Sequence, residues 1–268
     1  MTARSPRPAR LVALLAAGLV GLTALASQAC STLGTLGRLG GDDAYDRPPA
    51  PTRPRDPAGA KLYDAARRMR GRRIIISLQD RWLWLVEGSD TLFDAPVAVG
   101  KGETFTYRGK RFRFETPRGQ RRVLAKETDP VWVPPDWHYY EKAVEDGLEA
   151  VHLSPGQRVR LSDGTSIVVR GKSVGRVNRQ GRWWPFTPGK EIIFDGKIFI
   201  PPFGAPQREV PDALGTHKLD LGDGYLIHGT DEADAIGRPV SHGCVRMRNS
   251  DVARLFRAVE PGTPVVIF

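Results

Sequence analysis

The chain has 268 residues, of which 40% are apolar, and it carries 40 Lys and Arg against 30 Asp and Glu. This length fits one domain or two small ones, and the composition excludes both a wholly disordered chain and one that crosses a membrane many times. The 29 Gly and 22 Pro residues predict many turns, and therefore short strands rather than long helices.

Residues 1–29 have the layout of a secretory signal. Three arginines precede an uncharged apolar run over residues 11–26, and small residues follow that run. The run is shorter than the roughly 20 residues that span a bilayer. We therefore expect an exported protein of the periplasm or cell envelope. Removal of residues 1–29 leaves a net charge of +7, which suits an anionic wall polymer or a membrane surface and argues against a nucleic-acid partner.

The residue after this segment, Cys30, gives the end of the signal a second interpretation. Ala29-Cys30 resembles the end of a bacterial lipoprotein signal, in which the cysteine becomes lipidated. Ser27 departs from that pattern, because such signals usually carry Leu three positions before the cysteine. Simple cleavage and a lipid anchor through Cys30 therefore both stay open.

Beyond the signal, composition divides the chain into a tether and a folded domain. Residues 30–60 are rich in Gly, Pro, Asp and Arg and lack an apolar period, which is typical of a flexible tether. Residues 61–268 form the predicted domain. Within it, residues 141–200 are a turn-rich insertion with many arginines and a Trp183-Trp184 pair, which would suit a lid or a wall of a peptide-binding cleft. The alternatives are hairpin packing for the tryptophans and a solvated face for the arginines.

Short apolar and β-branched runs between turn residues predict strands in this domain. They lie at residues 74–78, 82–86, 94–99, 111–115, 167–169, 191–194, 198–200, 225–227 and 265–268. A short helix is expected at residues 60–69. A second helix should begin at Asn249-Ser250-Asp251, which can cap it, and should bury Val252 and Leu255 on one face. The predicted fold class is therefore mainly β with one or two short helices.

Cysteine usage indicates a chemical role for Cys244. Cys30 and Cys244 are the two cysteines of the chain, and removal or lipidation of Cys30 leaves Cys244 without an intramolecular partner. A lone thiol in an oxidising compartment is a liability unless it has chemistry to perform, although a buried inert cysteine is the alternative.

Two histidines and a glycine surround Cys244 in the sequence. His228 lies sixteen residues before it, and His242 and Gly243 come directly before it. A thiol becomes a good nucleophile when a nearby imidazole takes its proton. A glycine turn can also aim backbone N–H groups at one point, as an oxyanion requires. The alternative is a zinc site, but these residues are not spaced in the short pairs that zinc ligands usually form.

This stretch resembles the signature of the L,D-transpeptidase catalytic domain (YkuD-type). That signature is a strand-borne His-Gly, a loop, and then Ser/Thr-His-Gly-Cys-x-Arg, and every position is filled here. The turn Thr116-Pro117-Arg118-Gly119 and the segment from Leu214 to Tyr225 resemble other parts of the family, so the likeness covers about residues 72–130 and 201–268. The resemblance implies a mainly β, sandwich-like fold and an enzyme without a metal or an organic cofactor.

The resemblance also implies a role for each motif residue. Cys244 would be the nucleophile and His228 its general base, with the Gly229 carbonyl holding the other ring nitrogen. The backbone N–H groups of His242, Gly243 and Cys244 would form the oxyanion site.

Three further residues receive weaker roles. Ser241 would shape the loop together with His242. Arg246 would either hold this loop or meet a substrate carboxylate, and Tyr225 would contact the substrate.

The implied substrate is the peptidoglycan stem tetrapeptide. Cys244 would attack the amide between the L-centre of the third residue and the terminal D-Ala, and the thioester would pass to an acceptor amine. The acceptor would be a neighbouring stem peptide or a lipoprotein lysine, while water would make the protein an L,D-carboxypeptidase. A wall-binding module without turnover is the alternative from another class. A monomer is expected, and carbapenem-type β-lactams should acylate Cys244.

Overall fold

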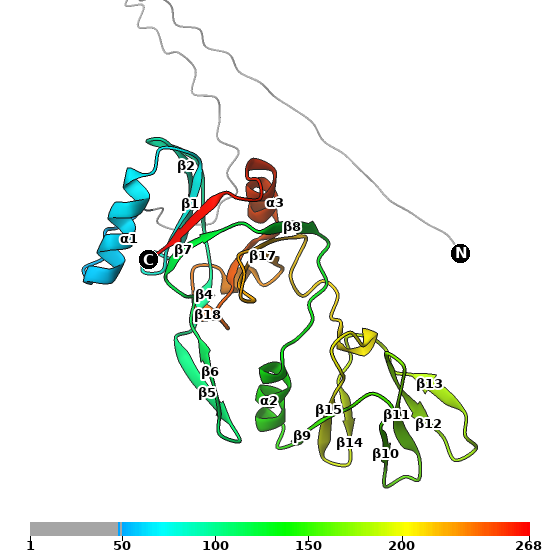
Figure 1. The fold of residues 1–268 in the computed structure, drawn as a ribbon. Coiled ribbons are helices and arrows are strands. Elements are labelled where there is room, and N and C mark those ends of the chain that lie inside the picture. Colours follow the sequence, from blue (N-terminus) through cyan, green and yellow to red (C-terminus); the bar gives the residue numbers. More distant parts are fainter. Residues whose placement is uncertain (1–47, 49) are drawn as a thin grey trace, which may run out of the picture. The chain divides into compact units, whose positions relative to one another are not determined.

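The structure, a computed structural model, describes residue 48 and residues 50–268, which all fall in one compact unit (Figure 1). The predicted signal, Cys30 and most of the predicted tether lie outside the described residues. Among the helices of the described part, none is long and apolar enough to cross a membrane.

The first sheet has five strands, in the order β3-β2-β1-β20-β7. Its strands are β1 (Arg73–Ser77), β2 (Trp82–Glu87), β3 (Asp90–Pro96), β7 (Gly119–Arg122) and β20 (Pro264–Ile267). Strand β20 runs parallel to β1, and the other pairs are antiparallel. Helix α1 (Pro57–Arg68) covers one face, where Ala66 packs with Ile75 and Trp84. Both faces of β1 are therefore buried, which explains why its sequence is a continuous apolar run rather than an alternating one.

The second sheet carries the histidine of the motif. Its order is β19-β17-β16-β8, and its strands are β8 (Ala125–Thr128), β16 (His217–Asp220), β17 (Leu226–Thr230) and β19 (Val245–Arg248). Helix α3 (Asn249–Ala258) packs beside them. The main core lies where the two sheets and α3 meet, and includes Ile76, Ile227, Met247 and Leu255.

A two-residue bridge encloses the insertion. Trp132 and Val210 exchange two backbone hydrogen bonds of 3.0 and 2.8 Å. Between them lie α2 (Asp136–Glu145), the three-stranded sheet β14-β15-β9 and the four-stranded sheet β10-β11-β12-β13. The strands are β9 (Glu149–His152), β10 (Arg158–Arg160), β11 (Ser166–Arg170), β12 (Ser173–Val177), β13 (Trp183–Pro185), β14 (Ile192–Phe194) and β15 (Lys197–Ile200). The bridged segment is longer than the predicted insertion, because it includes α2.

Two further strand pairs lie around the motif. Strand β4 (Val99–Gly100) pairs in parallel with β18 (Pro239–Ser241). Strands β5 (Glu103–Tyr107) and β6 (Lys110–Phe114) form a hairpin whose rings Phe105, Tyr107 and Phe112 pack against α2. In Figure 1 helix α2 runs between this hairpin on one side and β9 and β15 on the other. Two short 3₁₀ turns, η1 (Pro206–Arg208) and η2 (Ala233–Ala235), complete the described part.

The mainly β fold class is confirmed, with three helices in the described residues where one or two were expected. The missed helix, α2, directly follows a Pro-rich stretch and has a mixed apolar pattern. Helix α1 begins at Pro57 rather than at residue 60, with Asp56 as its cap. The expected cap of α3 is wrong in detail, because the Asn249 side chain accepts from the Thr216 N–H and donates to Asp231 instead.

Candidate active site

The loop from Ser241 to Cys244 joins β18 to β19 and is tied together by its first residue. The Ser241 hydroxyl donates to the Cys244 carbonyl at 2.5 Å and accepts from the Gly243 N–H at 3.1 Å. The Ser241 carbonyl accepts from the Lys101 N–H at 2.9 Å. Ser241 therefore shapes the loop. In this structure it also engages the Gly243 N–H, one of the three expected oxyanion donors.

A buried threonine holds the same loop from the opposite side. Thr116 donates its hydroxyl to the Gly243 carbonyl at 2.9 Å and accepts from the Gly100 N–H, also at 2.9 Å. Gly243 has a φ of 131°, and a Cβ there would lie 3.0 Å from the Tyr225 ring and 3.1 Å from the Glu115 carbonyl oxygen. Glycine is therefore required at this position both by the backbone angle and by the close contacts.

The surroundings of the Cys244 thiol favour its protonated form. The residue is partly exposed, and its Sγ lies 3.8 Å from the Gly224 carbonyl oxygen. Burial of the sulfur raises the pKa of Cys244, whereas the Leu226 N–H and the charge of Arg246 lower it, and burial has the larger effect. A base is therefore needed to form the thiolate.

The His228 imidazole is buried and neutral, with an exposed fraction of 4%. Its Nδ1 lies 2.7 Å from the Gly229 carbonyl oxygen. Because a carbonyl can only accept, Nδ1 carries the proton and the lone pair of the neutral ring is on Nε2. Burial lowers the pKa of His228 to about 4, against the opposing effect of the Gly229 and Leu214 carbonyls. The expected contact between His228 and the Gly229 carbonyl is thus present.

The register of two parallel strands relates this ring to the sulfur. Strands β17 and β19 pair Ile227 with Val245 and His228 with Arg246. Cys244 directly precedes β19, and the Leu226 N–H of β17 lowers the pKa of its thiol, so the cysteine lies close to this strand. His228 and Arg246, as paired residues of parallel strands, point to one face of the sheet. Ile227 and Val245 point from the other face into the core.

Arg246 contributes charge to this face and is held by an ion pair. Its Nη1 lies 3.0 Å from Glu232 Oε2, and its backbone N–H and carbonyl both bond to Ala98. Its positive charge lowers the pKa of both Cys244 and His228. Arg246 therefore favours a thiolate beside a neutral imidazole. This ion pair reaches Glu232 outside the 241–244 loop, so both expected roles of Arg246, holding the loop and meeting a substrate carboxylate, stay predictions.

Tyr225 lies against the loop and the core rather than free in solvent. Its ring packs on the main core and on the backbone of Gly243, and the Arg121 guanidinium lies 4.9 Å from the ring centroid. Tyr225 thus packs against the loop next to Cys244. Its expected contact with substrate stays a prediction.

His242 faces away from the sheet, toward α2. Its Nε2 lies 2.7 Å from Glu141 Oε2, and its ring stacks on Trp137 at 4.4 Å between centroids. Burial lowers the pKa of His242. These contacts favour the structural alternative for His242 over a role as the base of Cys244. The sequence did not point to Glu141 and Trp137, and it marked Thr116 only as part of a turn, because their separation from the motif in the chain gives no sign of contact.

Comparison with known proteins agrees with this geometry. The family model described as the L,D-transpeptidase catalytic domain (YkuD) matches residues 71–267, which is well over half of the chain. The chain belongs to the L,D-transpeptidase catalytic-domain family.

Three curated relatives illustrate the extent of the likeness. YkuD of Bacillus subtilis is 31% identical over 150 residues, which cover 56% of this chain and 75% of YkuD. ErfK/SrfK of Salmonella typhimurium is 44% identical over 131 residues, 48% of this chain and 40% of that protein. YbiS of Escherichia coli K12 is 37% identical over 91 residues, 34% of this chain and 30% of YbiS. All three carry L,D-transpeptidase in their names, and the chain spans less than a third of YbiS.

Solved structures of the family are more distant. The L,D-transpeptidase of Xylanimonas cellulosilytica is 19% identical, and the superposition covers 80% of this chain and 70% of that one with a TM-score of 0.36. The Enterococcus faecium L,D-transpeptidase C442S mutant is 16% identical, covers 75% of this chain and 50% of its own, and has a TM-score of 0.39.

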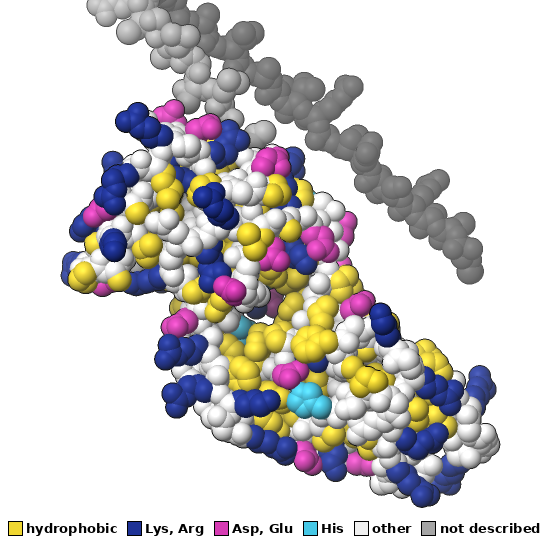
Figure 2. Space-filling model, in the orientation of Figure 1, with side chains coloured by type: hydrophobic (Ala, Val, Ile, Leu, Met, Phe, Trp, Pro, Cys, Tyr) yellow, Lys and Arg dark blue, Asp and Glu magenta, His cyan; other side chains and the backbone are white. Residues whose placement is uncertain are grey.

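In this member of the family, the insertion presents a basic surface. Its exposed arginines gather over strands β10–β13 (Figure 2), and they are Arg158, Arg160, Arg170, Arg179 and Arg182. The Trp183 ring covers Gly175 on the neighbouring strand, where a Cβ would lie 2.5 Å from the ring. Trp183 therefore fits the packing alternative. Over the described residues, no group of three or more His, Cys, Asp or Glu could hold a metal ion.

Replacing Thr116 should weaken the fold and the loop together. Thr116→Val leaves the Gly100 N–H and the Gly243 carbonyl without the hydroxyl, and a buried unsatisfied polar group costs about 1–3 kcal/mol. Thr116→Ser keeps the hydroxyl and serves as the control. Urea unfolding should show the loss for the valine variant and a smaller change for the serine variant, and equal stability of the two would contradict this role.

The buried imidazole should make stability depend on pH. The folded state holds His228 neutral down to about pH 4, whereas the unfolded chain takes up the proton near pH 6.5. The contribution of His228 to the free energy of unfolding is therefore complete above pH 6.5. It is lost as the pH falls toward 4, and the total loss is about 3 kcal/mol. His228→Gln should lack this component in denaturant unfolding at pH 7, 5.5 and 4. His217→Gln, on the neighbouring strand β16, is the control. An equal loss of stability with falling pH in wild type and H228Q would contradict the assignment of this component to His228.

Proposed function

We propose that the protein is a peptidoglycan L,D-transpeptidase that works through an acyl-enzyme on Cys244. One arrangement carries this proposal: His228 on β17 pairs with Arg246 of β19, two residues after Cys244, and the ring has its proton on Nδ1 and its lone pair on Nε2. A neutral imidazole of this kind can accept the thiol proton as the sulfur attacks a carbonyl carbon.

In the first half of the reaction, Sγ of Cys244 bonds to the carbonyl carbon of the amide between the L-centre and the terminal D-Ala. The thiol proton passes to Nε2 of His228. As the tetrahedral intermediate collapses, the C–N bond breaks and the proton moves to the nitrogen of the departing D-Ala. Backbone N–H groups of the 241–244 loop would meet the oxyanion, as the family resemblance implies.

In the second half, the nitrogen of an acceptor amine bonds to the thioester carbonyl carbon and gives a proton to His228. The C–S bond then breaks, and the proton returns from His228 to Sγ, which restores the thiol of Cys244. A side-chain amine of a neighbouring stem peptide would yield a 3→3 cross-link, and a lipoprotein lysine would yield an anchored protein. Water would yield a shortened stem peptide only. The same proposal places the protein in the periplasm or cell envelope. There it would act as a monomer, with or without a lipid on Cys30.

The products made from tetrapeptide muropeptides test this function. The mature protein should release D-Ala and form cross-linked dimers, and Cys244→Ala should lower release by a factor of about 10³ or more because the nucleophile is gone. Chromatography with mass spectrometry separates the outcomes. Tripeptide without dimers would identify a carboxypeptidase. No release by the wild type, with equal binding of both proteins to sacculi, would identify a binding module.

A carbapenem offers an independent test of the nucleophile. Its β-lactam carbonyl should acylate Cys244 and add one drug mass to the protein. Intact-mass spectrometry should detect this adduct on the wild type and not on Cys244→Ala. An unmodified wild type would count against a competent thiol.

Charge removal at Arg246 should move the thiol titration. Because Arg246 lowers the pKa of Cys244, Arg246→Gln should shift the pH profile of iodoacetamide alkylation to higher pH and slow alkylation at neutral pH. Arg238→Gln, an exposed position before β18, removes the same charge and should leave the profile in place. Superimposable profiles of wild type and R246Q would refute this role of the arginine.

A further inference from the structure

His242, the residue before Gly243 and Cys244, is held by side chains of helix α2 in the insertion. His242 is partly buried, and its Nε2 lies 2.7 Å from Oε2 of Glu141 on α2, a side chain that is 18% exposed. The other oxygen of Glu141 lies 3.1 Å from Nζ of Lys101. The backbone N–H of Lys101 in turn bonds to the Ser241 carbonyl. One carboxylate thus contacts the His242 side chain directly and also the side chain of Lys101, a residue next to the same loop.

Aromatic rings fix the orientation of the same imidazole. Trp137, one helical turn before Glu141, stacks on His242 with 20° between the ring planes. Phe114, at the end of β6, meets His242 edge-on at 4.6 Å and 83°. Phe114 and Trp137 also contact each other at 5.2 Å. Trp137 therefore packs on one face of the His242 ring and Phe114 meets the ring edge-on. The contact of Nε2 with Glu141 restricts the remaining rotation of the ring.

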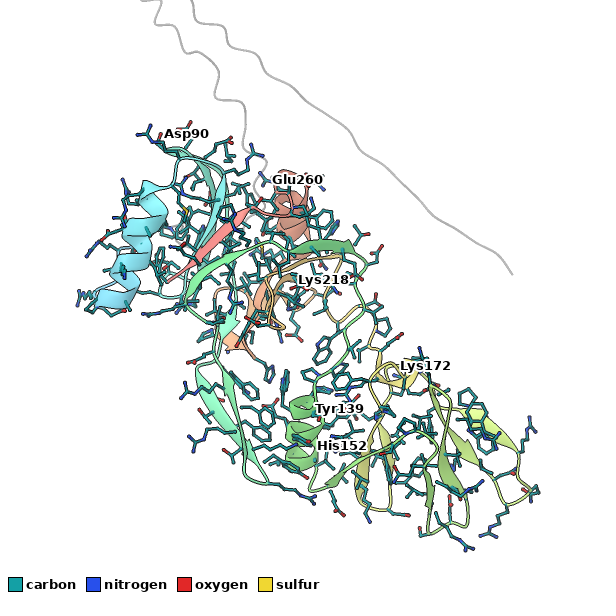
Figure 3. The ribbon with its side chains drawn as sticks, viewed as in Figure 1. Asp90, Tyr139, His152, Lys172, Lys218 and Glu260 are labelled. Atoms are coloured by element: carbon teal, nitrogen blue, oxygen red, sulfur yellow. The ribbon has the colours of Figure 1, made fainter. Side chains whose placement is uncertain are left out.

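Helix α2 is itself anchored firmly enough to act as a support. Arg208, which is 1% exposed, donates to Asp136 at 2.7 Å and to the Pro134 and Pro201 carbonyls at 2.8 and 3.0 Å. Tyr139, labelled in Figure 3, lies on this helix and packs with its neighbours against β9 and β15. The start of α2 is thus tied to residues at the other end of the insertion, and the Glu141 carboxylate is carried on a helix that is fixed to the insertion.

We propose that Glu141 is a positioning residue of this active site, which sets the place of Cys244 by holding His242. The inference rests on the proposed function, since it names what aligns the nucleophile of that reaction. His242 is joined to Cys244 by the single residue Gly243, so displacement of His242 would shift the loop amides and the sulfur together. Misplacement of reacting atoms by about 1 Å can cost on the order of 10²-fold in rate.

Substitutions at Glu141, with a matched control on the same helix, test this role. Glu141→Ala should lower kcat for D-Ala release on the order of 10²-fold with KM little changed, because alignment rather than binding is lost. Glu141→Gln keeps an acceptor for Nε2 and should recover most of that rate. Glu145→Ala, one turn further along α2 and exposed, should match the wild type. If Glu141→Ala fails to fold, Glu141→Asp, whose shorter side chain withdraws the carboxylate from His242, takes its place.

A double-mutant cycle tests whether Glu141 acts through His242. Glu141→Ala added to His242→Ala should cause no further loss, whereas independent, additive losses would overturn the proposal. Wild-type kcat in Glu141→Ala or Glu141→Asp would overturn it as well.

The same cycle, measured as the rate of Cys244 alkylation by iodoacetamide, needs no wall substrate. A wild type that releases no D-Ala would therefore refute the proposed function alone. The positioning role would then be decided by whether the two substitutions are non-additive in alkylation, as expected, or additive.

Discussion

The pairing of β17 with β19 is the constraint from which the site follows. It sets His228 beside Arg246 on one face, next to the cysteine that precedes β19, while Ile227 and Val245 turn into the core from the other. A slip of one residue in this register would turn the imidazole into the apolar core and expose the apolar residues. The core therefore enforces the register, and the register fixes where the candidate site residues lie.

Burial gives this pair its electrostatic character. Removing His228 from water keeps its ring neutral, and removing the sulfur from water keeps the thiol protonated. Both effects favour the neutral pair, whereas the Arg246 guanidinium, which lowers the pKa of Cys244, acts in the opposite direction on the thiol.

The sequence predicted the parts of the site that lie close together in the chain. His228, the loop to Cys244 and the Gly229 carbonyl were all implied by the family resemblance, because a single motif contains all three. The predicted strands around them follow from β-branched runs such as Ile74 to Ile76. The support of His242 could not be predicted in this way. Glu141 and Trp137 come from a helix whose mixed pattern hides it, and their contact depends on how the insertion folds back.

The five-stranded sheet also has a consequence for how the chain reaches its native state. Strand β20 lies inside the sheet, between β1 and β7, although it is the last strand of the sequence. During synthesis, the apolar strand β1 and the polar strand β7 therefore lack this pairing partner until residues 264–267 have been added. Completion of the domain becomes a late, all-or-none event. Any chain that ends before β20 would keep unpaired strand edges on β1 and β7 in the middle of the sheet.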